Sequence, residues 1–134
     1  MHFVQKSGVW NVQVGGSSDT PTLEMPNITN GNFIKVTVTF LAKTAGNADS
    51  GFNYRVEATN QTDAEALSAQ ESIVQSNAGW QTTTKTVFFR AKVSSQTGVE
   101  DVDFQVVFSK GELDGAGEIS DFLMYGEVVS LDVA

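Results

Sequence analysis

The sequence predicts an all-β domain, a two-sheet antiparallel β-sandwich of the jelly-roll type, and three observations lead to this prediction. Apolar and polar residues alternate with period two over several segments, as in strands with one buried face. Clusters rich in Gly, Asn, Asp and Ser separate these segments. Only 2 prolines occur in 134 residues. A chain of this length has room for one domain, so we assign residues 1–134 to a single sandwich.

Three segments alternate along their length. They are residues 34–40, 52–58 and 102–108. In each segment one side of the expected strand is apolar, and the other side is polar except for Val107. These segments are therefore predicted to be half-buried strands.

A fourth strand is expected between residues 82 and 93. Its apolar side carries Val87, Phe89, Ala91 and Val93, and its other side is polar except for Phe88. Two interpretations of Phe88 stay open. A loop covers the ring, or the ring is available to a partner.

The ends of the chain are expected to complete the sandwich. Trp10, Val12 and Val14 share a predicted inward face, and a short strand is predicted at residues 23–25. Residues 1–8 are left open as an extended N-terminal arm.

Residues 119–133 are predicted to form the last strand, with a bulge or bend near the flexible Gly126. The residues expected to face inward in one register are Ile119, Leu123, Tyr125, Val129, Leu131 and Val133. Residues 62–69 begin with a capping-box pattern and are the one helix candidate, about two turns long.

Catalytic and cofactor motifs are missing from the sequence. There is no cysteine, and the single histidine, His2, lies next to the N-terminus. Such a residue lacks the rigid support that a catalytic triad needs. No phosphate-binding or dinucleotide-binding glycine loop is present either. We therefore expect a protein that is not an enzyme and needs no cofactor.

The acidic residues lie on polar strand faces or in predicted turns. Asp121 is the exception, because it interrupts the predicted inward register of the last strand. One interpretation is a carboxylate that accepts backbone amide hydrogen bonds at a strand entry. The other is a ligand in a structural calcium site, which needs six to eight oxygens from converging strands.

Trp80 follows a predicted turn at residues 77–79 and also has two interpretations. The ring closes one end of the hydrophobic core, or it offers a flat platform to a sugar or a protein. Together with Phe88 it is the candidate ligand-binding residue of the chain.

The net charge of −8 comes from one part of the chain. Residues 1–99 hold seven acidic and seven basic residues, whereas residues 100–134 hold nine acidic residues and Lys110. An acidic surface without a basic stripe repels phosphate backbones, so we expect no nucleic acid partner. No segment approaches the roughly 20 apolar residues of a membrane span, so we expect no membrane partner.

The order of these features resembles carbohydrate-binding modules with a jelly-roll fold. The segments that carry the resemblance are NFIKVTVTFLAKT (residues 32–44), GWQTTTKTVFFRA (79–91) and GEISDFLMYGEV (117–128). This resemblance covers most of the chain and implies a sugar ligand, without assigning the sugar-stacking rings to positions.

A small, acidic, cysteine-free jelly roll also resembles the capsid decoration (cement) proteins of tailed bacteriophages. The chain starts at Met1 without a secretory signal pattern, from which we expect synthesis in the host cytoplasm. This resemblance implies a virion structural protein on the capsid exterior, bound to the major capsid protein or other virion proteins, as a small homo-oligomer. It is the first expectation for function, and a carbohydrate-binding module, displayed on a virion or not, is the alternative.

Overall fold

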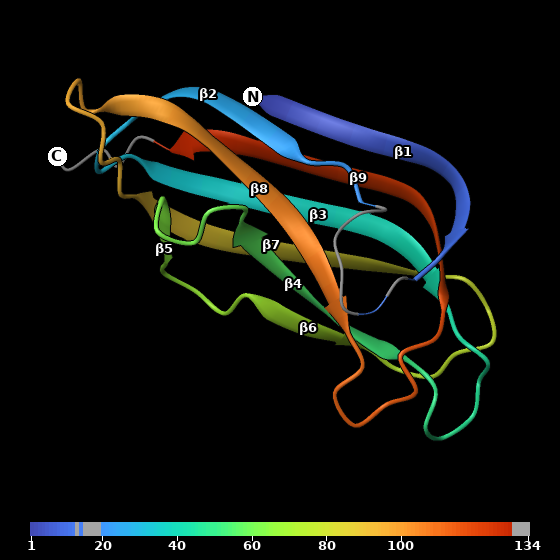
Figure 1. The fold of residues 1–134 in the computed structure, drawn as a ribbon. Coiled ribbons are helices and arrows are strands. Elements are labelled where there is room, and N and C mark those ends of the chain that lie inside the picture. The colour runs from blue at the N-terminus through green and yellow to red at the C-terminus, as the bar shows by residue number, and fades with distance from the viewer. Residues whose placement is uncertain (13, 15–19, 130–134) are drawn as a thin grey trace, which may run out of the picture.

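Two antiparallel β-sheets pack face to face in the computed structural model, which describes residues 1–12, 14 and 20–129 (Figure 1). The strands of this part of the chain are β1 (His2–Asn11), β2 (Leu23–Thr29), β3 (Phe33–Lys43), β4 (Phe52–Ala58), β5 (Ala64–Ala66), β6 (Glu71–Val74), β7 (Gln81–Ala91), β8 (Val99–Ser109) and β9 (Glu118–Val129). None of the described segments is a helix long and apolar enough to cross a membrane.

The strand order is that of a jelly roll. One sheet has the order β1-β9-β3-β7-β5 and the other has the order β2-β8-β4-β6. Without the three-residue β5, each sheet has four strands, and the chain passes between the sheets as two Greek keys do. The predicted fold class is confirmed.

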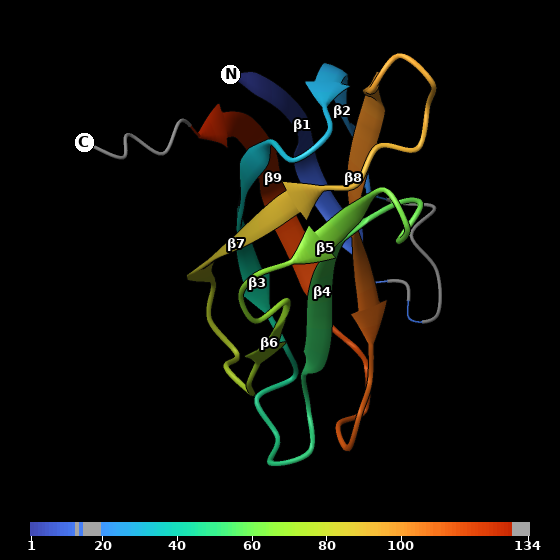
Figure 2. The same ribbon diagram turned by 90° about the vertical axis from the view of Figure 1, so that its left-hand side faces the viewer.

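The connections β3–β4, β6–β7 and β8–β9 gather at one end of the sandwich, the lower end in Figure 2. Hydrogen bonds tie them together. The amide of Thr44 donates to the carbonyl of Asn77 at 2.9 Å, and the amide of Asp114 donates to the carbonyl of Asp49 at 2.8 Å. This end of the molecule, called the loop end below, is therefore built from three segments that are distant in sequence.

The hydrophobic core lies between the sheets and contains the predicted inward rows of β3, β4, β7 and β8. The fully buried residues of these rows are Ile34, Val36, Val38, Phe40, Phe52, Tyr54, Val56, Val87, Phe89, Val102, Phe104, Val106 and Phe108. The rings of Phe40 and Tyr54 meet edge to face with centroids 5.1 Å apart. Each large side chain buried in this way contributes about 1.5–3 kcal/mol to stability.

The predicted register of the last strand is wrong beyond Ser120. Asp121 has a φ of +55°, and the pairing of β9 with β3 shifts between Thr39 and Leu41. Such a bulge inserts one extra residue and moves every following side chain to the opposite face. Phe122 and Met124 are consequently buried, whereas Leu123, Tyr125 and Val129 lie on the outer side. Leu131 and Val133 lie outside the described residues.

The bulge predicted near Gly126 therefore lies at Asp121 instead. Packing explains why position 126 is a glycine. A Cβ at this position would lie 2.7 Å from Sδ of Met25 and 3.0 Å from Cδ2 of Leu23. The buried side chains of Met25 and Leu23 from the other sheet fill the space that a side chain at this position would occupy, so a larger residue would have to displace them.

The helix predicted at residues 62–69 is not formed. Residues 64–66 are strand β5, in which Ala64 pairs with Ala91 and Ala66 pairs with Phe89. Thr62, the first residue of the capping-box pattern, lies in a turn where the Asn60 side chain accepts hydrogen bonds from it, and Glu65 lies in β5. Tertiary pairing at a sheet edge overrides the weak helix propensity of this short segment.

The N-terminal residues 1–8, considered as an arm, lie in or next to β1, which pairs with β9 of the same chain. Trp10 packs edge to face on Phe122 with centroids 6.0 Å apart and is half-buried. Val14, predicted to share its inward face, is 43% exposed.

Candidate functional site

The outer side of the five-stranded sheet carries a surface that we call the threonine face. Its residues alternate along β3, β7 and β9 with the buried core residues, so they point away from the core. The residues of the threonine face are Thr37, Thr39, Leu41, Thr82, Thr84, Thr86, Leu123 and Tyr125.

Hydroxyl groups on this face are paired across neighbouring strands. The Oγ1 atoms of Thr37 and Thr86 lie 3.0 Å apart, and those of Thr39 and Thr84 also lie 3.0 Å apart. Cross-strand hydrogen bonds of this kind hold the hydroxyls in fixed positions. Thr37 is buried at 3% exposure, whereas Thr39, Thr82, Thr84 and Thr86 are at least partly exposed. The hydroxyls of these four residues keep lone pairs for a further partner and can both donate to and accept from a ligand.

Trp80 lies at one end of the face. It directly precedes β7, and its ring is 41% exposed, so the interpretation as a core residue is wrong. The Nζ atom of Lys43 lies 5.1 Å from the ring centroid. Lys43 belongs to the outer side of β3, and this contact places Trp80 on the same side.

Phe88 lies at the opposite end of the face. It pairs with Lys35 in the row next to Thr86, and its ring is also 41% exposed. The interpretation in which a loop covers the ring is therefore wrong, and the ring is accessible.

The two predicted ligand-binding residues therefore bracket one row of threonines. Trp80 and Phe88 are eight positions apart, which at the rise of an extended strand is about 26 Å. This length suits an extended ligand with several units, whereas a single small molecule would contact one ring.

Charged groups lie at the ends of the strands and not between them. Lys43 Nζ lies 3.7 Å from Oε2 of Glu118 at the Trp80 end, and Lys35 lies opposite Glu127 in the strand register at the Phe88 end. The centre of the threonine face is uncharged, so contacts there come from hydroxyls and apolar groups.

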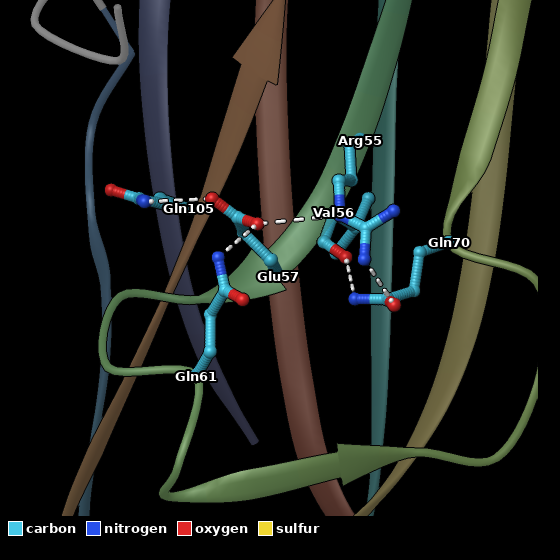
Figure 3. A network of polar contacts seen from close by, with 6 residues as sticks. All are labelled: Arg55, Val56, Glu57, Gln61, Gln70 and Gln105. Carbon is cyan, nitrogen blue, oxygen red and sulfur yellow. Dashed lines mark hydrogen bonds and ion pairs between the residues drawn. The ribbon is translucent and has the colours of Figure 1, made fainter.

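The outer side of the four-stranded sheet has a different character, with polar side chains that bind one another (Figure 3). Glu57 is 8% exposed and accepts hydrogen bonds from Gln61 and Gln105, each at 3.1 Å. Its Oε2 atom also lies 3.3 Å from Nε of Arg55, whose Nη2 atom donates to Gln70 at 2.7 Å. Because these groups satisfy one another, the network holds the β4–β5 and β5–β6 connections against the sheet.

Asp121, the candidate calcium ligand, is exposed in the bulge of β9. One of its carboxylate oxygens accepts a hydrogen bond from the Ser120 hydroxyl at 3.2 Å. Among the described residues, no three His, Cys, Asp or Glu side chains are grouped closely enough to hold a metal ion.

Sequence reasoning missed several residues that matter for the surface. Tyr125 was expected in the core, and Glu57 was not recognised as a buried carboxylate. Asp121 and Gly126 interrupt the alternation and indicate that this strand is irregular. They do not show where the bulge lies, so the side of the sheet that carries Tyr125 could not be predicted. Glu57 is buried by Gln61 and Gln105, and no local pattern records such contacts.

Comparison with known proteins gives similarity at low sequence identity. No protein-family model matches the chain, and no curated protein matches it by sequence. A cyclase from Fischerella sp. TAU, solved in complex with 4-(1H-indol-3-yl)butan-2-one, is 12% identical with a TM-score of 0.40. That match covers 89% of this chain and 61% of the cyclase, so this chain spans less than two thirds of the cyclase's length.

Two further solved structures belong to carbohydrate-related proteins. A family two carbohydrate esterase from Cellvibrio japonicus is 11% identical, with a TM-score of 0.32 and coverage of 98% of this chain and 36% of the esterase. A CBM4 structure is 15% identical, with a TM-score of 0.26 and coverage of 93% of this chain and 94% of its own chain. No functional residue is transferred from any of the three.

Proposed function

We propose that the chain is a non-catalytic glycan-binding module that binds an extended neutral glycan along the threonine face. The observation that carries the proposal is the arrangement of two exposed rings, Trp80 and Phe88, at the two ends of a row of outward threonines. Sugar rings present apolar C–H surfaces that stack on aromatic rings and hydroxyls that form hydrogen bonds. The threonine face offers both kinds of partner, with a ring at each end and hydroxyls between them.

The charge distribution supports a neutral ligand. The net charge of −8 repels polyanions at long range, and the middle of the face holds no charged group that would select one. The sequence-based resemblance to carbohydrate-binding modules points to the same class of ligand. We therefore place this function ahead of the virion role that the sequence favoured.

The test is a glycan microarray of neutral and charged polysaccharides, followed by calorimetric titration of the strongest ligand. We expect saturable binding to neutral polysaccharides. Trp80→Ala and Phe88→Ala should each weaken that binding by about tenfold or more, as the loss of one stacking contact does. Val99→Ala is the matched control, because Val99 is an exposed apolar residue (37%) of the other sheet. An array without signal, or unchanged affinity in both ring variants, would overturn the proposal.

A virion structural role stays as the second candidate, and one observation favours it. Strand β1 is an edge of the five-stranded sheet, and its side chains Phe3 and Val9 are 66% and 59% exposed. Edge strands present unpaired backbone groups on which another chain can add a strand. Neighbouring genes for portal, protease and major capsid proteins, together with stoichiometric binding of the protein to purified shells, would support this role. Shells that neither bind the protein nor gain stability from it would exclude the role.

A further inference from the structure

The loop end of the sandwich contains a groove of about 570 Å³ that lies apart from the centre of the threonine face. Its walls come from the β3–β4 connection, from β4, from β6 and the residues after it, and from the β8–β9 connection. Figure 1 shows these connections together at one end of the molecule. The volume falls within the range of ligand sites in proteins.

A second depression, of about 320 Å³, continues the groove around the β6 edge. The two depressions share Ile73, Gln75 and Ser76. The second one reaches Thr82 and Thr83 on β7. Thr82 also belongs to the threonine face, so one continuous path leads from the loop end to the Trp80 end of that face.

The lining combines apolar patches with uncharged polar groups. Ile73 is 59% exposed although it lies on a strand, and Leu113 adds a second apolar side chain. The polar groups are amides and hydroxyls. They come from Ser50, Asn53, Gln75, Ser76, Gln81, Thr82 and Thr83, and among the described residues Glu112 is the one charged residue that lines either depression.

The Asn53 amide lies in the groove wall. It packs against Gly111, where an added Cβ would lie 2.5 Å from Nδ2 of Asn53. Gly111 also has a φ of +54°, a conformation that favours glycine. The β8–β9 connection thus passes directly against the amide, and both line the groove.

We propose that this groove is a second subsite for a neutral oligosaccharide, continuous with the threonine face through Thr82. Amide side chains each offer a donor and an acceptor, which suits the paired hydroxyls of a sugar ring. The apolar side chains of Ile73 and Leu113 contact its C–H surface. The inference rests on the proposed function. It adds that a long glycan passes from the face around the β6 edge into the groove.

The experiment is an NMR titration of the ¹⁵N-labelled full chain with linear neutral oligosaccharides. The probes are xylo-, cello- and manno-oligosaccharides, each as the trisaccharide and the hexasaccharide. We expect chemical-shift changes at Asn53, Gln75 and Ser76 in addition to changes on the threonine face. We also expect the hexasaccharide to bind about tenfold more tightly than the trisaccharide, because contiguous subsites add contacts on one ligand.

The double variant Ile73→Ala/Gln75→Ala tests the groove, and Glu71→Ala is the matched control. Glu71 is an exposed residue of the same strand that lies outside the groove lining. The double variant should lose the hexasaccharide advantage and keep trisaccharide binding, whereas the control should keep both. Both changes replace partly or fully exposed side chains, so the fold should persist, and the ¹H–¹⁵N spectrum verifies it.

The outcomes separate the two proposals. Hexasaccharide binding that changes only face residues, and that the double variant leaves intact, overturns the groove and leaves the proposed function standing. Shifts confined to the groove, with unchanged affinity in Trp80→Ala and Phe88→Ala, support the groove and overturn binding on the face. No shift with any probe overturns both.

Discussion

The hydroxyl of Tyr54 lies 2.9 Å from Oγ1 of Thr83, and this hydrogen bond joins the two sheets. Tyr54 belongs to β4 of one sheet and Thr83 to β7 of the other. Thr83 also lines the second depression, next to the groove. The bond therefore links the stability of the sandwich to the shape of that depression.

Tyr54→Phe should lower the free energy of unfolding by about 1 kcal/mol, because it removes one hydrogen bond and keeps the buried ring. Urea unfolding measures the change. Thr83→Val removes the other partner, and the double variant should lose little more than either single variant. Strictly additive losses would show that the two side chains do not stabilise each other.

Gly117→Ala should destabilise the protein by about 1–3 kcal/mol, as overpacking of a core does. A Cβ at Gly117 would lie 2.7 Å from the buried ring of Phe52 and 3.1 Å from the carbonyl oxygen of Lys43, and neither group can move freely. Gly79→Ala is the control, since the nearest atom to its Cβ is Oδ1 of Asn77 at 3.6 Å. Thermal unfolding should separate the two variants. Equal melting temperatures would contradict the close approach at Gly117.

Asp103→Asn should raise the melting temperature at pH 7. Partial burial, and then repulsion by Glu24, Asp101 and Asp63, raises the pKa of Asp103 above its ordinary value of 3.8. Glu24 lies directly opposite Asp103 in the pairing of β2 with β8. The folded state therefore binds the proton more readily than the unfolded state, and the ionised carboxylate lowers stability at pH values above the raised pKa.

The advantage of the Asp103→Asn variant should shrink as the pH falls through the raised pKa toward 3.8, because the wild-type carboxylate then becomes neutral. It should also shrink in high salt, which screens the repulsion among exposed carboxylates. Melting curves between pH 3 and 8, at two ionic strengths, measure both effects. An advantage that is constant with pH would exclude a charge effect.

Local alternation predicted the inward rows of β3, β4 and β8 because each of these strands is half-buried along its length and pairs regularly. The same rule failed at Asp121, since a bulge depends on how β9 meets both β1 and β3. It also did not anticipate the inward-facing Thr83, whose hydroxyl is satisfied by the hydrogen bond with Tyr54 of the other sheet. The exposed positions of Trp80 and Ile73 depend on where connections pass, and the groove depends on three segments distant in sequence. These features are set by tertiary packing and leave no local pattern.

Glu57→Ala should destabilise the protein by about 1.5–3 kcal/mol, the range for hydrogen bonds to a charged group. The change removes the acceptor of Gln61 and Gln105 and the ion partner of Arg55. Glu57→Gln keeps the volume, but it loses the charge and places an amide donor near other donors. It should therefore fall between the wild type and Glu57→Ala in urea unfolding.

Loss of the Glu57 carboxylate should also determine which segment of the protein becomes open to proteolysis first. Gln61 anchors the β4–β5 connection to Glu57, so limited proteolysis of Glu57→Ala should begin in that connection at temperatures where the wild type resists cleavage. Glu71→Ala, a loss of the same charge on an exposed strand position, should leave both stability and cleavage unchanged.

Binding on the threonine face should persist in Glu57→Ala, because the network and that face belong to opposite sheets. Loss of glycan binding in this folded variant would instead place the ligand on the four-stranded sheet.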